Sequence, residues 1–236
     1  MIELDIPETP THAITLMPET RVTLAPGAAT ASPMQNLVSL GVPQSFELTP
    51  GKVAPDDELK NFLNNESATT RFDLVRFICS FTPTNASRVV EAWFQISLSH
   101  LANDGPGQPI AWSMAPQKLT EKTQVTRTVK IGGSLKLFDA GIDTGGVVVT
   151  NGVIEKPFLI ARKEASSTPE WYFKELENVR LDGNYELTMV VKNPGKARVT
   201  GKIELLANIR EVRYGIFPMS FKASLENSPA ASFTLG

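Results

Sequence analysis

The residues best suited to nucleophilic chemistry are few: one cysteine, Cys79, and two histidines, His12 and His100. A catalytic cysteine needs a nearby base that holds its thiolate form. Cys79 instead lies between aromatic neighbours in residues 77–81 (FICSF), where a free thiol usually behaves as a small core side chain. We therefore expect Cys79 to be buried and unreactive. A single cysteine also excludes a disulfide within the chain.

Metal and nucleotide motifs are absent from the sequence. The two histidines lie far apart and no Cys-x-x-Cys pair occurs, so a zinc-type ligand set is missing. Residues 139–146 (DAGIDTGG) lack the dense oxygen ligands and final glutamate of an EF-hand, and a tight turn explains them better. Residues 131–134 (IGGS) lack the Lys-Ser/Thr pair of a Walker loop. We expect no catalytic residue, no metal and no cofactor.

Three tryptophans, Trp93, Trp112 and Trp171, form the candidate interaction surface, because tryptophan often anchors a partner or a sugar. The competing interpretation is that they fill the core of the fold, which is the commoner role of tryptophan in an all-β chain. The sequence favours the core interpretation and leaves the binding role open.

Charge is distributed unevenly along the 236 residues. The net charge of −2 argues against generic nucleic-acid binding, which depends on many Lys and Arg contacts to phosphate. Residues 1–70 hold nine acids and three bases, so the remainder is mildly basic. Either this is chance unevenness, or the acidic segment packs against a basic face of this chain or of a neighbour.

Proline spacing separates the chain into two parts. Residues 1–55 carry eight prolines, which no helix or central strand tolerates at such intervals. We expect an extended proline-rich N-terminal arm over 1–55 that lies on a β surface, partly on a neighbouring subunit. Residues 56–236 are then a β-sandwich domain that folds without the arm.

No apolar run of bilayer length and no signal-type leader occurs, which favours a cytoplasmic or particle-associated protein.

The pattern of residues 56–236 predicts mainly strands. A short helix is expected from Asp56, with strands following over 72–79 and 91–99. Residues 185–210 read as a hairpin around a turn at 193–196, with one packed and one wet face. Residues 167–170 resemble a helix start, although strand-forming aromatics follow. The fold class is all-β: an antiparallel β-sandwich (jelly-roll or Ig-like) or barrel-like core, with an extended N-terminal arm and one or two short helices.

Residues 120–136 alternate polar and apolar side chains. The phase continues through Gly132-Gly133, so the glycine pair is expected to bend one strand rather than separate two. Such alternation is typical of a membrane-inserting hairpin and equally of a sandwich strand with one solvated face. Arg127 and Lys136, at or near the apolar face, favour the sandwich strand. A second hairpin is expected at Asn151-Gly152.

Elimination leaves three hypotheses about function. The first is a non-catalytic protein-interaction or assembly protein, whose arm contacts other protein subunits, most simply in a homo-oligomer. The second is a pore-forming or ligand-binding β-sandwich, the only hypothesis in which a membrane is a partner. The third is a hydrolase whose carboxylates converge from distant strands.

Overall fold

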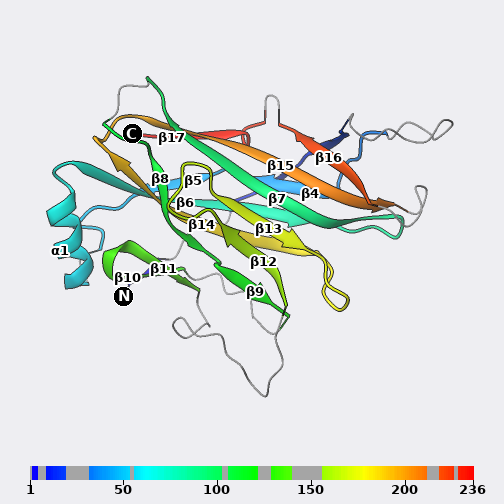
Figure 1. The fold of residues 1–236 in the computed structure, drawn as a ribbon, viewed down its shortest axis with the longest axis horizontal. Coiled ribbons are helices and arrows are strands. Elements are labelled where there is room, and N and C mark those ends of the chain that lie inside the picture. The colour runs from blue at the N-terminus through cyan, green and yellow to red at the C-terminus, as the bar shows by residue number, and fades with distance from the viewer. Residues whose placement is uncertain are drawn as a thin grey trace, which may run out of the picture.

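Two antiparallel sheets stacked face to face form the body of the molecule, in a computed structural model that describes residues 2–4, 9–19, 32–53, 56–102, 106–121, 129–139, 156–211, 218–225 and 228–236 (Figure 1). The eight-stranded sheet has the order β3-β16-β15-β7-β13-β12-β9, and β17 also pairs with β15. Its strands are β3 (Thr15–Pro18), β7 (Ser87–His100), β9 (Lys118–Thr120), β12 (Pro157–Arg162), β13 (Glu170–Lys174), β15 (Val199–Glu211), β16 (Met219–Ser224) and β17 (Ser232–Leu235). The expected antiparallel β-sandwich is confirmed.

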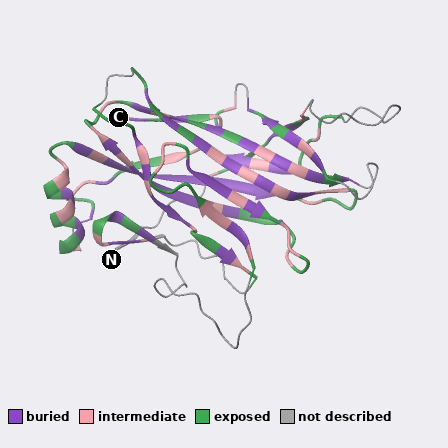
Figure 2. Cartoon of the chain, in the orientation of Figure 1, coloured by how far each residue is buried: buried purple, intermediate pink, exposed green. Residues whose placement is uncertain are grey.

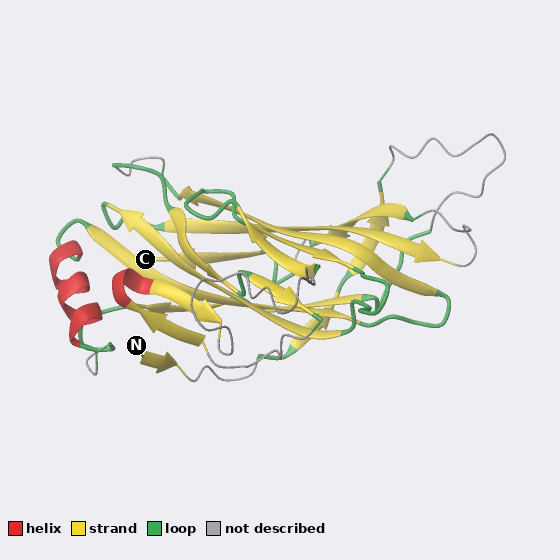
Figure 3. Cartoon of the chain, turned by 60° about the horizontal axis from the view of Figure 1, so that its bottom comes forward, coloured by secondary structure: helices red, strands yellow, loops and turns green. Residues whose placement is uncertain are grey.

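The second layer is a six-stranded sheet in the order β2-β4-β6-β14-β8, with β5 also paired to β6. Its strands are β2 (Thr11–Ala13), β4 (Val38–Gly41), β5 (Gln44–Glu47), β6 (Thr70–Phe81), β8 (Ile110–Ala115) and β14 (Gly183–Pro194). A separate three-stranded sheet, β1-β10-β11, consists of β1 (Ile2–Leu4), β10 (Val129–Gly132) and β11 (Lys136–Asp139). Figure 3 shows it at the same end of the molecule as helix α1 (Asp57–Glu66).

The main core lies between the two large sheets. Phe77 of β6 reaches Phe94 of β7 at 5.5 Å and Trp171 of β13 at 6.1 Å between ring centroids, so aromatic side chains join the layers. The alternation expected in residues 91–99 is confirmed, because Phe94, Ile96 and Leu98 are buried and the residues between them are not. Figure 2 shows the resulting stripes of burial along the long strands.

The predicted helix is confirmed as α1. Asp56 caps it, since its Oδ1 accepts a hydrogen bond of 3.0 Å from the backbone N–H of Leu59. Asp57 and Glu58 occupy the first turn, where acidic side chains favour the positive end of the helix dipole. Leu59 and Leu63 are the buried residues of the helix, one turn apart on the same face.

The expected hairpin over 185–210 is wrong, although both of its strands exist. β14 pairs with β6 and β8, whereas β15 pairs with β7, β16 and β17, so the two strands belong to opposite layers. The turn between them crosses from one sheet to the other, with Gly195 at φ +74°. Alternation and a turn signal locate strands in a chain, but they do not identify the strand with which each one pairs.

One smaller expectation is also corrected, and one open alternative is decided. Gly132 ends β10, a short 3-10 turn η1 (Gly133–Leu135) follows, and β11 pairs back onto β10, so the glycine pair separates two strands. Glu170 begins strand β13 rather than a helix. The expected hairpin at Asn151-Gly152 and the strand residues 122–128 lie outside the described residues.

The N-terminal segment supplies strands to both layers. β2 and β4 extend the six-stranded sheet through β6, and β3 pairs with β16 in the other sheet. Leu16, Val38 and Leu40 are at most 1% exposed and belong to the main core. The division of the chain at residue 55 remains a prediction. The burial of these side chains nevertheless opposes our expectation that residues 56–236 fold without the segment.

Cys79 is fully buried in the main core, and burial raises the pKa of its thiol far above its usual range. We expect no reaction with a thiol reagent in the native protein, because a buried protonated thiol is a poor nucleophile. After denaturation the same reagent should label one thiol per chain. Rapid labelling of the folded protein, followed by mass spectrometry, would show that Cys79 is accessible.

Candidate functional site

The connection between β9 and β12 leaves and rejoins the sandwich at one place. β9 is the last strand on the path of the eight-stranded sheet, and it pairs antiparallel with β12. Leu119 lies opposite Leu159, and Thr120 lies opposite Pro157. Residues 121–156 therefore start and finish on neighbouring strands at a sheet edge. β10 and β11, the described strands of this connection, belong to neither of the two large sheets.

The described part of the connection packs on the outer face of the six-stranded sheet. Along β6, Phe77 and Cys79 face the main core, while Phe72 and Leu74 face the opposite way into a second cluster. We call this cluster the outer core. Its buried members are Leu48, Val53, Leu59, Leu63, Phe72, Leu74, Ala115, Ile131, Leu135, Leu137 and Val190.

The connection contributes three aliphatic side chains to the outer core. Ile131 of β10 and Leu135 of η1 are fully buried, and Leu137 of β11 is 5% exposed. Helix α1 lies against the same cluster through Leu59 and Leu63. The alternation of residues 129–137 therefore has a packed face within the described part, as a sandwich strand would. That packing is on the outside of the sandwich rather than between its sheets.

Side-chain contacts and one short backbone ladder hold the described part of this segment in place. The Trp112 Nε1–H donates to the carbonyl of Ser134 at 2.7 Å, and the backbone N–H of Leu137 donates to Ser113 Oγ at 3.0 Å. Lys136 Nζ donates to the Trp112 carbonyl at 3.1 Å and lies 3.7 Å from Glu164. β10 also pairs with the three residues of β1, a ladder much shorter than the one that joins β14 to β6.

The outer face also corrects our expectation about β14. We predicted that Thr188 lies on a wet face, but it is 2% exposed. Beside it, Arg76 Nη2 is 2.6 Å from Glu186 Oε1, and the Arg76 side chain is 4% exposed. Both faces of the central strands β6 and β14 are therefore covered. The apolar residues on both faces of 72–79 are the sequence signal for this.

The three tryptophans do not form one surface. Trp171 is fully buried between the two large sheets, where its ring fills the core. Trp112 lies on the outer face of the six-stranded sheet, with Lys136 Nζ 5.1 Å and Lys192 Nζ 4.7 Å from its ring. Trp93 is half-buried in the other sheet. Trp112 is the one that contacts the connection, and a binding role for Trp93 and Trp112 stays a prediction.

Trp93 belongs to a polar and aromatic cluster on the outer face of the eight-stranded sheet. The centroid of its ring lies 5.4 Å from that of Tyr172. The Arg162 guanidinium lies 3.9 Å from the centroid of the Tyr172 ring. Glu91 accepts hydrogen bonds of 2.8 Å from the Tyr172 hydroxyl and the Asn208 amide. Burial raises the pKa of Glu91, but these hydrogen bonds and Lys174 outweigh it and lower the pKa overall. Burial and the Glu91 contact raise the pKa of Tyr172 to about 12.

Within the described residues, no three His, Cys, Asp or Glu side chains are grouped as metal ligands. No helix in that same part of the chain is long and apolar enough to cross a bilayer. Neither observation identifies a function.

No protein-family model and no curated protein matches this chain. Among solved structures, one named "Pore forming protein" aligns with 96% of this chain and 89% of its own, at 8% identity and a TM-score of 0.41. The NetB toxin of Clostridium perfringens in its membrane-inserted form aligns with 95% of this chain and 94% of its own, at 8% identity and a TM-score of 0.36.

These comparisons contradict our first hypothesis, a non-catalytic assembly protein with a structural role. One solved structure is named as a pore-forming protein and the other as a toxin in its membrane-inserted form, and neither is named as an assembly or shell protein. The first hypothesis is therefore withdrawn. The likeness concerns the fold alone.

Proposed function

We propose that this chain forms pores, and that the connection between β9 and β12 is the segment that enters the membrane. The observation that carries the proposal is the position of that connection. Its ends are neighbouring paired strands at a sheet edge, while its described part packs outside the sandwich in a small core of its own. The segment can therefore leave the outer face while both large sheets keep their strand order.

The length and pattern of the connection suit two membrane strands. Residues 121–156 are 36 in number, and a membrane-crossing strand needs roughly 9–11 residues. Val125, Val129 and Ile131 alternate with Thr126, Thr128 and Lys130. A hairpin of this kind turns its apolar side chains to lipid and its polar ones to water. This length and this pattern support the second hypothesis from the sequence.

Release of the segment costs free energy that burial in lipid can offset. It must break the three-residue ladder between β1 and β10 and free Ile131, Leu135 and Leu137, whose burial contributes about 1.5–3 kcal/mol each. When the same side chains enter lipid they are again removed from water, so the free energy of their burial is recovered. Unpaired backbone groups in hydrocarbon are costly, so the released hairpins must pair with those of other copies. The proposal thus makes the chain a homo-oligomer that acts at a membrane, with no catalytic activity assigned to it.

A disulfide that locks the segment to the sandwich tests this function. Ser113→Cys with Leu137→Cys places a thiol on each of two residues that already touch, since the Ser113 hydroxyl accepts a hydrogen bond of 3.0 Å from the Leu137 backbone N–H. We expect the wild-type protein to release dye from phosphatidylcholine–cholesterol vesicles. The oxidised double variant should release almost none, because its segment cannot leave the outer core. Reduction should restore release.

Cys79 does not complicate this experiment, since it is buried and its thiol stays protonated. The matched control is Ser113→Cys alone, which should release dye equally under oxidising and reducing conditions. Equal release by the oxidised and reduced double variant would show that the segment stays in place during pore formation. A wild-type protein that leaves the vesicles intact would contradict pore formation itself.

A further inference from the structure

One row of side chains crosses the eight-stranded sheet on its outer face. Its members lie opposite one another on neighbouring strands, from β9 through β12, β13, β7 and β15 to β16: Lys118, Ile160, Tyr172, Trp93, Leu206 and Lys222. Met17 of β3, which is 44% exposed, lies opposite Lys222 and completes the row. We call these residues the cross-sheet row. Figure 1 shows the strands that carry it side by side in one layer.

The centre of the cross-sheet row is apolar. Its four central residues are half-buried: Ile160, Tyr172, Trp93 and Leu206. Their chain neighbours Phe94, Trp171 and Leu205 are at most 1% exposed and point between the two large sheets. Among the described residues, the four central ones belong to neither the main core nor the outer core. A contiguous apolar strip on the outside of a sheet marks an interaction surface.

A polar row runs along each side of this strip. On one side the order is Arg162, Glu170, Gln95 and Glu204. On the other side the order is Lys174, Glu91, Asn208 and Ser220. Both rows are linked by their own contacts, since Glu170 lies 3.5 Å from Arg162 and Glu91 accepts a hydrogen bond of 2.8 Å from Asn208. A fixed polar rim around an aromatic centre is typical of protein–protein contacts.

The surface is large enough for a weak but specific contact. Seven strands extend the row over about 29 Å, because neighbouring strands lie about 4.8 Å apart. The three rows together cover about 20 Å along the strands. Two such surfaces placed face to face would bury roughly 1,200 Å² in total, at the low end of specific protein interfaces.

The two polar rows are complementary to each other, which favours a second copy of this chain as the partner. A two-fold axis along the cross-sheet row turns the second copy over, so each polar row meets the opposite polar row. The opposed pairs are then Glu170 with Lys174 on β13, Gln95 with Glu91 on β7, and Glu204 with Asn208 on β15. Each pair places a carboxylate against an ammonium or an amide group.

The remaining charges agree with this arrangement. Lys222 would lie next to its own counterpart, but in each copy it is 3.2 Å from Glu204. An anionic lipid surface suits the face less well, because Glu91, Glu170 and Glu204 would repel it.

We propose that the cross-sheet row is the contact surface of a face-to-face dimer, formed by two copies of the free protein. Both copies use the same surface, so the contact closes after two copies. The inference goes beyond the proposed pore, because the connection between β9 and β12 packs on the other large sheet. It holds or fails without any membrane step.

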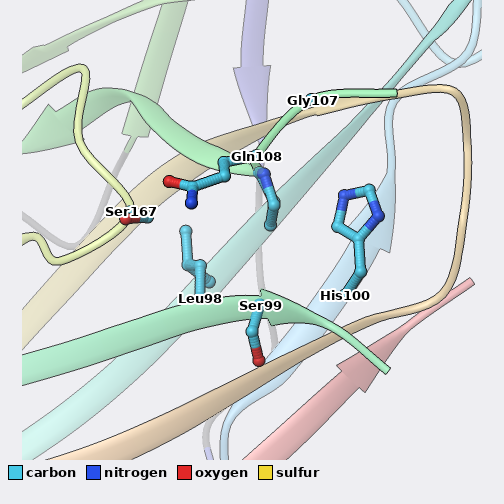
Figure 4. A pocket seen from close by; sticks show the side chains of 7 residues that line it. Leu98, Ser99, His100, Gly107, Gln108 and Ser167 are labelled. Atoms are coloured by element: carbon cyan, nitrogen blue, oxygen red, sulfur yellow. The ribbon is translucent and has the colours of Figure 1, made fainter. Parts of the chain in front are cut away.

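The contact surface is separate from the pocket at the end of β7. That pocket has a volume of about 320 Å³ and is lined by residues 98–100, 107–109 and 167 (Figure 4). Both ring nitrogens of His100 are buried, so the ring offers a ligand no hydrogen bond. The cross-sheet row passes β7 at Trp93, and none of its residues lines the pocket.

Sedimentation velocity of the full chain, without lipid, tests the dimer. Between about 1 and 100 μM, a range that includes the affinity expected for so small an interface, the wild type should change from monomer to dimer. Leu206→Arg sets two cations against each other at the centre of the contact and should weaken dimerisation at least about tenfold. Thr200→Arg adds the same charge on the same face of β15, outside the three rows, and should leave the dissociation constant unchanged.

Covalent trapping identifies the face even if Leu206→Arg disturbs the fold. Leu206→Cys treated with a short bis-maleimide should give a covalent dimer, because the two-fold axis brings this residue next to its own counterpart. Thr200→Cys should stay uncoupled, and Cys79 is buried and does not react.

Three results would overturn the proposal. The first is a chain that stays monomeric up to about 100 μM. The second is a dimer that Leu206→Arg leaves at full strength or that Leu206→Cys does not link. The third is a monomer that sediments with phosphatidylserine vesicles and loses this binding in Trp93→Ala, which would assign the row to lipid.

Discussion

Deleting residues 1–50 should unfold the sandwich rather than trim its surface. The deletion removes β2, β3, β4 and β5 from the two large sheets. It also removes five buried aliphatic side chains from the main core: Ile14, Leu16, Leu37, Val38 and Leu40. Burial of each is worth about 1.5–3 kcal/mol, so the combined loss is comparable with the total stability of a domain, roughly 5–15 kcal/mol. Circular dichroism should show no cooperative thermal transition.

The control is deletion of residues 1–10. It removes β1, which pairs with β10 in the three-stranded sheet, and keeps every strand of the two large sheets. We expect this shorter deletion to retain a cooperative transition. A chain of residues 51–236 that melts at the wild-type temperature would instead show that the N-terminal strands are dispensable, as the proline spacing alone suggested.

The sequence predicted individual elements better than their partners. Alternation located the buried strand at Phe72–Cys79, and a cap signal located the helix at Asp56, because both features are local. The hairpin after Tyr185 failed because its turn passes between layers, and no local pattern distinguishes that crossing from a hairpin. The N-terminal segment was predicted as an extended arm rather than as part of the two sheets, since its strands are only three or four residues long, which fits between prolines without leaving a periodic signal.

The candidate site was predicted in part. The alternation of residues 120–136 raised the membrane-hairpin hypothesis, yet the same pattern fits a sandwich strand, so the sequence could not choose. What the structure adds is three-dimensional: β9 and β12 are neighbours, and Leu137 packs outside the sandwich.

Leu187→Ala and Ile203→Ala should each lower the free energy of unfolding by about 2–5 kcal/mol, as expected for buried aliphatic side chains whose removal leaves a cavity. Leu187 in β14 is fully buried and Ile203 in β15 is 5% exposed, and both belong to the main core from opposite layers. Lys202→Ala, on the exposed face of β15, should change stability by less than about 0.5 kcal/mol. Thr188, the neighbour of Leu187 in β14, is unsuitable as a control because it is buried on the outer face. Chemical denaturation of the three variants measures these differences, and an equal loss from Lys202→Ala would mean that β15 presents its other face to the core.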